Sequence, residues 1–295
     1  MVDNIVDNSP QDNSPRDNSP RDNSPQDSSP HDRGRRLRIA VIGIGEAGGA
    51  IAADLATRPL DVSCWDPAVG EPPPEARAAG DARDAAAGAD AILSVNSASA
   101  ARQVAREVAP ALEPGQLYAD LNTSAPSLKV ELAALVRPTG ALFADVALIA
   151  PVPGNGLRTP CLVSGPGAER FVALFGPLGM PAQITGTEPG VAAARKLLRG
   201  VFMKGIAAAA IESLAAASAS GCEDWLHDEI AQVLEQADPA LLDRLITGSR
   251  RHAQRREQEM QAAQEMLSEL GVRPRVSRAA ADWLAQLQSE VVRGS

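Results

Sequence analysis

The feature that most constrains the fold of this chain is a glycine-rich turn with the sequence GIGEAG at residues 43–48. It follows a short apolar run rich in β-branched residues and precedes a stretch that favours a helix. In such a strand–turn–helix unit the glycines allow a tight turn, close approach to a pyrophosphate, and close helix–strand packing. The alternative is a fold whose glycines only turn the chain. The residues predicted to bind a dinucleotide here are Gly43, Gly45, Glu46, Ala47 and Gly48.

An acidic residue in the expected place strengthens this prediction. Asp66 follows the apolar run DVSCW, 18 residues after Gly48. A carboxylate at the end of the second strand binds ribose hydroxyls and repels a 2′-phosphate. Residues 67–69 are Pro, Ala and Val, so no arginine follows at once to accept such a phosphate. The sequence therefore favours NAD(H), with NADP(H) as the alternative.

Three parts can be distinguished along the chain. Residues 1–35 hold five repeats of the DNSPQ type, whose composition predicts a disordered tail, either inert or regulatory through its Ser-Pro pairs. Residues 36–189 alternate apolar runs with helix-forming stretches, which predicts an α/β Rossmann domain with a doubly wound, mostly parallel sheet. Residues 190–295 contain no strand-like run and predict an all-α domain. One long interdomain helix, from Val191 to about Ser220, joins the two.

Composition excludes several classes of protein. The formal net charge of -9 argues against nucleic acid as a partner. Cys64, Cys161 and Cys222 show no metal-site spacing, so we expect no metal site and free thiols in a reducing cytoplasm. No uninterrupted apolar run reaches the roughly 18 residues of a membrane helix, and the N-terminus has no apolar signal segment. We therefore expect a cytoplasmic protein with no membrane partner.

The long helix carries a stripe of positive charge. Lys196, Arg199 and Lys204 share one face of an otherwise apolar helix, with Gly200 between them. Buried unpaired cations are costly, so a cleft that binds an anionic ligand would explain the stripe. Lys196 would then act as acid/base, its pKa lowered by apolar walls and nearby cations, while Arg199 or Lys204 binds a carboxylate or phosphate. The alternative is a solvated face paired with acids on other helices.

Five stretches of the chain resemble the β-hydroxyacid dehydrogenases, the group containing 3-hydroxyisobutyrate and 6-phosphogluconate dehydrogenases. The closer resemblance is to a subgroup of NAD(P)-dependent oxidoreductases with a phosphogluconate-dehydrogenase-like C-terminal domain. The stretches are VIGIGEAG (41–48), LYADLNTSAPSLK (117–129), DVALIAPVPGNGLRTPCLVSGP (145–166), RKLLRGVFMKGIAAAAIESLAAA (195–217) and RRHAQRREQEM (250–260). The resemblance implies hydride transfer between nicotinamide and the hydroxyl carbon of a small anionic β-hydroxyacid, or the matching oxoacid. It also implies a homodimer that exchanges helices.

The resemblance implies roles for individual residues. Lys196, six residues after Gly190, would be the proton-transferring acid/base. Asn122 and Thr123 would orient substrate and nicotinamide, and Asn96 would face the cofactor. The residues implied to bind the acid group of the substrate are Arg199, Lys204 and, from the cluster RRHAQRR, Arg256. The alternative for that cluster is a solvated helix face.

The chain departs from the family in places that matter for chemistry. Arg199 and Gly200 stand where many relatives have asparagine, and residues 149–151 replace a Ser-Gly-Gly substrate loop. Met203 replaces the general-acid glutamate of the phosphogluconate enzyme, which argues against decarboxylation of 6-phosphogluconate. Two alternatives stay open: an imine or ketimine reductase, although such relatives generally lack the lysine, and a non-catalytic dinucleotide-binding protein.

Overall fold

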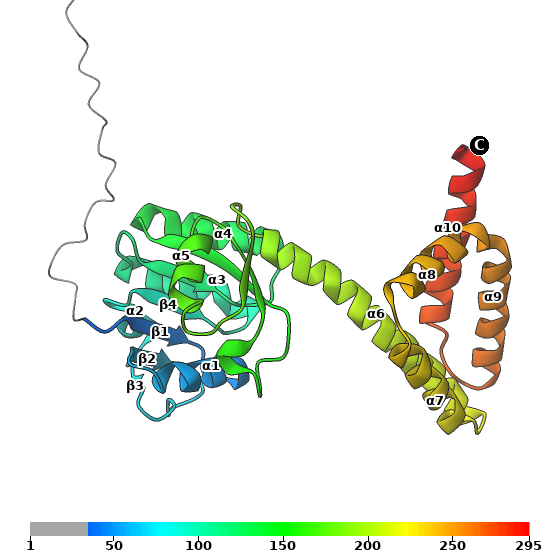
Figure 1. The fold of residues 1–295 in the computed structure, drawn as a ribbon, viewed down its shortest axis with the longest axis horizontal. Helices are drawn as coiled ribbons and strands as arrows, with labels where there is room; N and C mark the ends of the chain where they lie inside the picture. The colour runs from blue at the N-terminus through cyan, green and yellow to red at the C-terminus, as the bar shows by residue number, and fades with distance from the viewer. Residues whose placement is uncertain (1–34, 295) are drawn as a thin grey trace, which may run out of the picture. The chain divides into compact units, whose positions relative to one another are not determined.

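The computed structural model describes residues 35–294, which form an eight-stranded sheet followed by five helices (Figure 1). The repeat tail predicted over residues 1–35 lies outside the described residues, apart from Arg35. The strands are β1 (Arg38–Ile42), β2 (Asp61–Trp65), β3 (Arg77–Ala78), β4 (Ala91–Ser94), β5 (Leu117–Asp120), β6 (Leu142–Leu148), β7 (Cys161–Ser164) and β8 (Ala182–Gly186). Their spatial order is β3-β2-β1-β4-β5-β6-β7-β8.

The predicted Rossmann architecture, a mostly parallel sheet, is confirmed. Every neighbouring pair of strands is parallel except β6 and β7, which are antiparallel. That exception follows from the connection, because residues 149–160 form a loop with one short 3-10 turn and no crossover helix. The sequence pattern does not predict β3, since its two residues carry no apolar run.

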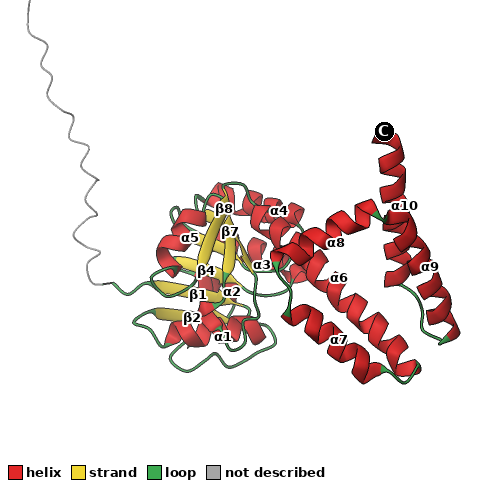
Figure 2. Cartoon of the chain, turned by 45° about the vertical axis from the view of Figure 1, so that its right-hand side comes forward, coloured by secondary structure: helices red, strands yellow, loops and turns green. Residues whose placement is uncertain are grey.

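Helices cover both faces of the sheet (Figure 2). One face packs against α1 (Glu46–Ala56) and α5 (Ala168–Phe175). The other face packs against α2 (Ala82–Ala86), α3 (Ala98–Val108) and α4 (Pro126–Val136). Successive residues of β1 alternate between these two cores, so the strand is buried on both faces. This explains why β1 appears in the sequence as a continuous apolar run rather than an alternating one.

The region after Gly190 is helical, as predicted. It contains α6 (Val191–Ala219), α7 (Glu223–Glu235), α8 (Pro239–Arg251), α9 (Ala253–Glu269) and α10 (Val276–Gly294). A glycine often ends a helix, so the sequence predicts helices over 239–247 and 249–270 with a break at Gly248, but the chain breaks at His252 instead. Gly248 continues α8, and a Cβ there would lie 2.9 Å from Nη2 of Arg256. The glycine therefore makes room for a guanidinium group and does not end the helix.

By length and composition, α6 could cross a membrane. An 18-residue window within it has a mean hydropathy of 1.4, and 11% of that window is buried. The expectation that no uninterrupted apolar run reaches this length still holds, because Lys204 and Glu212 interrupt the apolar residues of α6. It required an uninterrupted run of strongly apolar residues, whereas alanines give α6 its hydropathy. The same property is met by core helices of soluble proteins, so it does not by itself assign α6 to a membrane.

Candidate functional site

The glycine-rich turn has the geometry of a phosphate cradle. Gly43 has a φ of +95°, and a Cβ there would lie 2.2 Å from the carbonyl oxygen of Val95. A Cβ at Gly48 would lie 1.8 Å from the carbonyl oxygen of Gly43. At Gly45 a Cβ would meet nothing within 4 Å, and no side chain caps this end of α1. Two glycines are thus required by packing, while the third faces open space at a helix N-terminus suited to phosphate.

Asp66 lies directly beside this turn. Its Oδ2 accepts a hydrogen bond from the Ile44 N–H at 2.9 Å, and its Oδ1 accepts from the N–H groups of Ala68 and Val69 at 2.8 and 3.1 Å. With two lone pairs per oxygen, Oδ2 keeps capacity for one further hydrogen bond, whereas Oδ1 already accepts two. The structure therefore places a carboxylate next to the phosphate cradle, where the ribose of a dinucleotide is expected.

Asn96 offers a second polar group at the same edge of the sheet. Its Nδ2 donates to Ser94 Oγ at 3.1 Å, while its Oδ1 is buried without a hydrogen-bond partner among the described residues. A Cβ at Gly43 would lie 3.1 Å from the Asn96 Cβ, so the amide adjoins the turn. A buried acceptor without a partner fits a ligand that brings a donor, and the site as a whole fits a dinucleotide.

The structure brings Lys196 and Thr123 together. Lys196 lies in the second turn of α6, and its Nζ donates to Thr123 Oγ1 at 2.7 Å. Burial lowers the pKa of Lys196 from its ordinary value, and the positive charges of Lys129 and Lys204 lower it further, against an opposing effect of Asp145. A lysine that reaches its neutral form more readily, bonded to a hydroxyl, is suited to proton transfer.

The other predicted cations divide into two groups. Arg199 and Lys204 are exposed on α6, and the Lys204 ammonium folds back to 3.7 Å from where a Cβ of Gly200 would lie. Arg256 of α9 donates from Nη1 to Ser249 Oγ of α8 at 2.8 Å. The described contacts of Arg256 thus lie within the helical region and do not join it to Lys196. Its binding of substrate stays a prediction.

Asn122, predicted to orient substrate and nicotinamide, makes hydrogen bonds within the protein, and its role toward a ligand stays a prediction. It is 4% exposed, and its Oδ1 accepts from the Asn96 N–H at 2.6 Å. Its Nδ2 donates to Asp120 Oδ1 at 2.5 Å and to Ser94 Oγ at 3.3 Å. Both ends of the amide are therefore bonded within the protein, so Asn122 holds the ends of β4 and β5 in place. Thr123, which is exposed, is the residue of this motif open to a ligand.

Sequence analysis overlooked a buried charge cluster of Lys129, Asp120 and Asp145. The Nζ of Lys129 lies 2.6 Å from Asp120 Oδ2 and 3.2 Å from Asp145 Oδ1, and all three side chains are fully buried. A signal for it exists in the sequence, because Asp120 ends one apolar run and Asp145 interrupts another, and the two runs form neighbouring strands in which these residues pair. Two buried carboxylates require a cation, and Lys129 lies in the helix between those strands.

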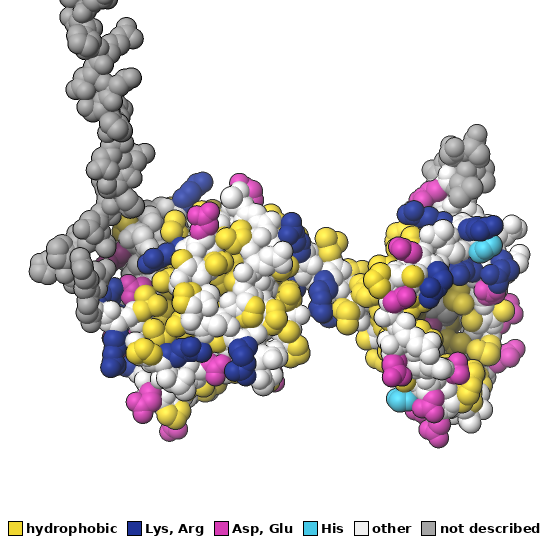
Figure 3. Space-filling model, viewed as in Figure 1, with side chains coloured by type: hydrophobic (Ala, Val, Ile, Leu, Met, Phe, Trp, Pro, Cys, Tyr) yellow, Lys and Arg dark blue, Asp and Glu magenta, His cyan; other side chains and the backbone are white. Residues whose placement is uncertain are grey.

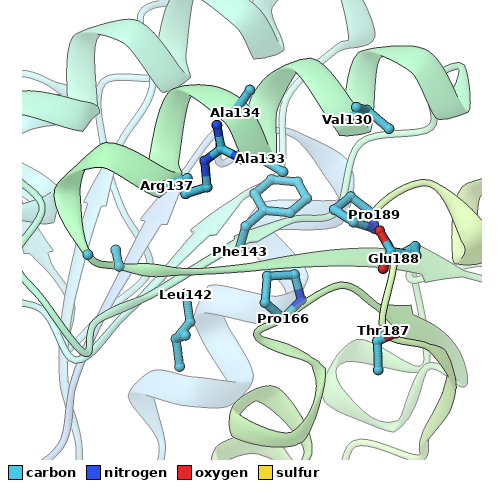
Figure 4. Close-up of a pocket in the computed structure, with 12 residues that line it drawn as sticks. Val130, Ala133, Ala134, Arg137, Leu142, Phe143, Pro166, Thr187, Glu188 and Pro189 are labelled. Atoms are coloured by element: carbon cyan, nitrogen blue, oxygen red, sulfur yellow. The ribbon is translucent and has the colours of Figure 1, made fainter.

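A cavity of about 520 Å³ lies elsewhere, between α4 and β6 (Figure 4). The Phe143 ring, Pro166 and Pro189 line it, with Arg137 and Glu188 as its charged residues. None of its lining residues belongs to the glycine turn or to the Lys196–Thr123 pair. This cavity therefore does not mark the predicted chemistry, which lies along α6 and the carboxyl ends of the strands.

Comparison with known proteins agrees with this geometry. Residues 38–158 match the family described as "NAD binding domain of 6-phosphogluconate dehydrogenase", and residues 217–287 match a domain of unknown function, DUF1932. A conserved hypothetical protein from Sinorhizobium meliloti 1021 is 28% identical, with 87% of this chain and 90% of that chain covered and a TM-score of 0.57. A protein of unknown function described as structurally similar to 3-hydroxyacid dehydrogenases is 24% identical, covering 88% and 100%, with a TM-score of 0.55.

An imine reductase from Myxococcus stipitatus, solved in complex with NADP⁺, is 21% identical, covering 86% and 94%, with a TM-score of 0.73. At this identity the likeness shows a shared fold of sheet and helices. The NAD-binding family match, by contrast, includes the glycine turn, Asp66, Asn96 and Thr123. It shows that the N-terminal region is a nicotinamide-dinucleotide-binding domain. Residues 38–158 are therefore similar to the NAD-binding domain of 6-phosphogluconate dehydrogenase, and the likeness to solved structures extends the shared fold over most of the chain.

Proposed function

We propose that the protein catalyses reversible hydride transfer between a nicotinamide cofactor and the hydroxyl carbon of a small anionic β-hydroxyacid, or the matching oxoacid. The observation that carries this proposal is the 2.7 Å bond between Lys196 Nζ and Thr123 Oγ1. It places a lysine of lowered pKa beside an exposed hydroxyl, at the carboxyl edge of a dinucleotide-binding sheet. An alcohol that loses a hydride must also lose a proton, and this lysine is placed to accept it.

Each residue of the site has a part in this proposal. The bound nicotinamide supplies or accepts the hydride. The backbone of Gly45 and the first turn of α1 would hold the pyrophosphate. On oxidation Lys196 takes the hydroxyl proton, and on reduction it returns that proton to the new alcohol oxygen. Thr123 orients the reacting oxygen, and the exposed charges of Arg199 and Lys204 attract the acid group.

We propose NAD(H) as the preferred cofactor. The carboxylate of Asp66 already binds the N–H of Ile44 within the glycine turn, so its position is fixed beside the ribose site. A fixed negative charge there repels a 2′-phosphate. Arg77, the nearest downstream arginine, is paired with Asp84 at 2.9 Å and is thereby engaged elsewhere.

A second candidate activity is reduction of a C=N bond on the same scaffold. Its support is the likeness in fold to the imine reductase, at a TM-score of 0.73. The same lysine could protonate the nitrogen of the product amine. The presence of Lys196 favours the alcohol–ketone reaction, because oxidation requires a base at this position and imine reduction does not.

We propose that the protein works as a homodimer assembled through its helical region. An apolar groove of about 570 Å³ is lined by α6, α7, α9 and α10, with Leu226, Met260 and Leu267 among its residues. Large side chains on α6 are also exposed, including Leu198 at 71% and Val201 at 74%. Apolar side chains cover much of α6 and the helices beside it in Figure 3. A second copy would bury matching surfaces on both protomers, as closed symmetric dimers do.

Turnover by the wild type and by Lys196→Ala tests the proposed reaction. Both proteins are assayed with NAD(H) and NADP(H) against hydroxyacids, oxoacids and cyclic imines, and cofactor binding is followed by NADH fluorescence. Loss of the acid/base should lower kcat about 10²–10⁴-fold without weakening cofactor binding. Arg195→Ala is the matched control, because Arg195 is the neighbouring cation and is exposed. Activity confined to imines would favour the second candidate, and cofactor binding without any Lys196-dependent activity would indicate a non-catalytic protein.

A further inference from the structure

The buried cluster of Lys129, Asp120 and Asp145 has no part in the reaction proposed above. Lys129 Nζ donates two hydrogen bonds inside the protein, to the Asp120 carbonyl oxygen at 2.9 Å and to Asp120 Oδ2 at 2.6 Å, and forms an ion pair with Asp145 Oδ1 at 3.2 Å. A buried ion cluster is weak evidence for stability, since apolar residues of similar volume often do as well. Its placement beside the proposed site therefore calls for another explanation.

One arm of the cluster holds the start of α6. Asp145 Oδ2 accepts from the N–H groups of Gly190 and Ala193, both at 3.0 Å. It also accepts from Ser164 Oγ at 3.1 Å, and that oxygen in turn accepts from the Ala192 N–H at 3.0 Å. The residue that precedes the helix, Gly190, has no capping side chain of its own. Side chains from β6 and β7 thus cap α6 one turn before Lys196, where a negative charge suits the helix dipole.

The other arm holds the partner of Lys196. Asp120 accepts from Asn122 Nδ2 at 2.5 Å, and Asn122 immediately precedes Thr123. The two atoms of the Lys196–Thr123 bond are therefore carried by segments that meet at the same buried cluster. Movement of either carboxylate would change the distance across that bond.

We propose that Lys129, Asp120 and Asp145 form the positioning unit of Lys196. The unit holds the lysine's helix turn and its Thr123 partner on one framework, and the charge of Lys129 opposes the charge of Lys196. This inference rests on the proposed function for its meaning, because a poised amine matters only if it moves a proton. The effect of the unit on the titration of the Lys196 amine can nevertheless be measured without an activity assay.

Electrostatics agrees with this geometry. After burial, the charge of Lys129 is the largest cause that lowers the pKa of Lys196, ahead of Lys204, while Asp145 raises it. Lys129, Lys204 and Asp145 are the charged groups that shift the pKa of Lys196. Arg195 and Arg199 lie on the same helix, α6. Of the strands packed against α6, β7 adds only the buried Cys161 and β8 adds no titratable side chain. Lys129 is thus the one buried cation beside Lys196 in the described part of the chain.

The test measures the titration of Lys196 in the full-length protein, by its rate of acetylation with acetic anhydride as a function of pH. The double variant Lys129→Met/Asp120→Asn removes the cation together with one carboxylate, so that no second unpaired charge is left buried. Its Lys196 midpoint should rise by about one pH unit, a tenfold loss of neutral amine at a given pH. Asp145→Asn should lower the midpoint, since it removes an opposing charge. Asp120→Asn alone is the matched control and should not raise it.

In the reductive direction, where protonated Lys196 is the acid, the basic limb of the pH–kcat profile should move with the same sign in each variant. The inference would be overturned if the Lys196 midpoint stays unchanged in both the double variant and Asp145→Asn. It would also be overturned if the two variants shift that midpoint in the same direction. If thermal melting shows that the double variant does not fold, Asp145→Asn decides: a lower midpoint supports the inference and an unchanged one overturns it. If midpoints move as expected while Lys196→Ala retains full turnover, the proposed function fails and the positioning unit stands.

Discussion

The sheet region and the helical region of this chain differ in how they bury apolar side chains. The strands and their flanking helices enclose two cores that include large residues such as Phe171 and Tyr118. After Gly190 the buried hydrophobic residues in the described chain are six alanines and two leucines. The same stretch holds fifteen of the eighteen large apolar side chains that are exposed, among them Trp225 and Trp283. The sheet region encloses its large apolar side chains, whereas the helical region leaves most of its own exposed in the single chain.

A high content of hydrophobic residues therefore does not by itself allow a region to bury its own apolar side chains. Alanine-rich helices bury little area per residue, so five of them enclose a small core and leave their larger side chains outside. A second copy is the partner that the proposed homodimer supplies. Each prediction below tests one side of this contrast.

The largest effect is expected where the helical region lacks cover. Val201→Glu/Ile211→Glu introduces two charges on α6, at side chains that are 74% and 69% exposed in the single chain. If each is buried against a second copy, the two should cost about 4 kcal/mol of dimerisation free energy, or about three orders of magnitude in dissociation constant. Light scattering after size exclusion measures the mass. Gln232→Glu on α7 is the control, and a wild type that runs as a monomer at micromolar concentration would refute the contrast.

A smaller effect is expected in the sheet region, where packing is complete. Gly48→Ala forces a methyl group to 1.8 Å from the Gly43 carbonyl oxygen, so the backbone must shift. We expect a loss of about 2–3 kcal/mol in the free energy of unfolding, as for other overpacked sites, together with loss of NADH binding. Gly45→Ala is the matched comparison, since a Cβ there meets nothing within 4 Å. It should leave stability within about 0.5 kcal/mol and weaken only cofactor binding. Equal destabilisation of both variants in urea titrations would contradict the assigned roles.

The smallest effect concerns a contact inside the helical region. Glu212 of α6 accepts from the N–H groups of Arg275, Val276 and Ser277 at 2.6–2.8 Å and so caps α10. Burial would raise its pKa, but these donors outweigh burial and lower the pKa. The stabilisation is therefore present above the ordinary pKa of 4.5 and is lost as the pH falls through the lower, folded-state value.

Glu212→Gln should cost about 1 kcal/mol at neutral pH, as the loss of a charged cap does. Thermal melting of wild type and variant between pH 3 and 7 measures this. The two curves should converge at the acid end, and a gap independent of pH would show that the carboxylate charge is not what holds α10. Glu265→Gln, the same change at an exposed position on α9, serves as the control substitution.

Much of the fold follows from local patterns in the sequence. The apolar runs locate every strand of the sheet except β3, and α4 and α6 begin where Pro126 and Gly190 indicate. Local sequence patterns do not predict contacts between residues that lie far apart in the chain. Gly248 suggests a helix end, but the Arg256 side chain lies against it, and the bonds of Asn122 to Asn96 and Asp120 are not evident from its motif. The Lys129 cluster is missed for the same reason, since its members come together only when β5 and β6 pair.

The cap that Asp145 places on α6 also has a consequence for how the chain acquires its structure. The capping contacts span 45 and 48 residues, so they are long-range by the measure that slows folding. The start of α6 cannot be secured until β6 has joined the sheet, and β6 leaves the ribosome before α6 does. Because synthesis starts at the N-terminus, the sheet can include β6 before α6, which depends on the Asp145 cap, has been made. A circular permutant that begins at α6 would present the helix first, and its refolding should show an added slow phase.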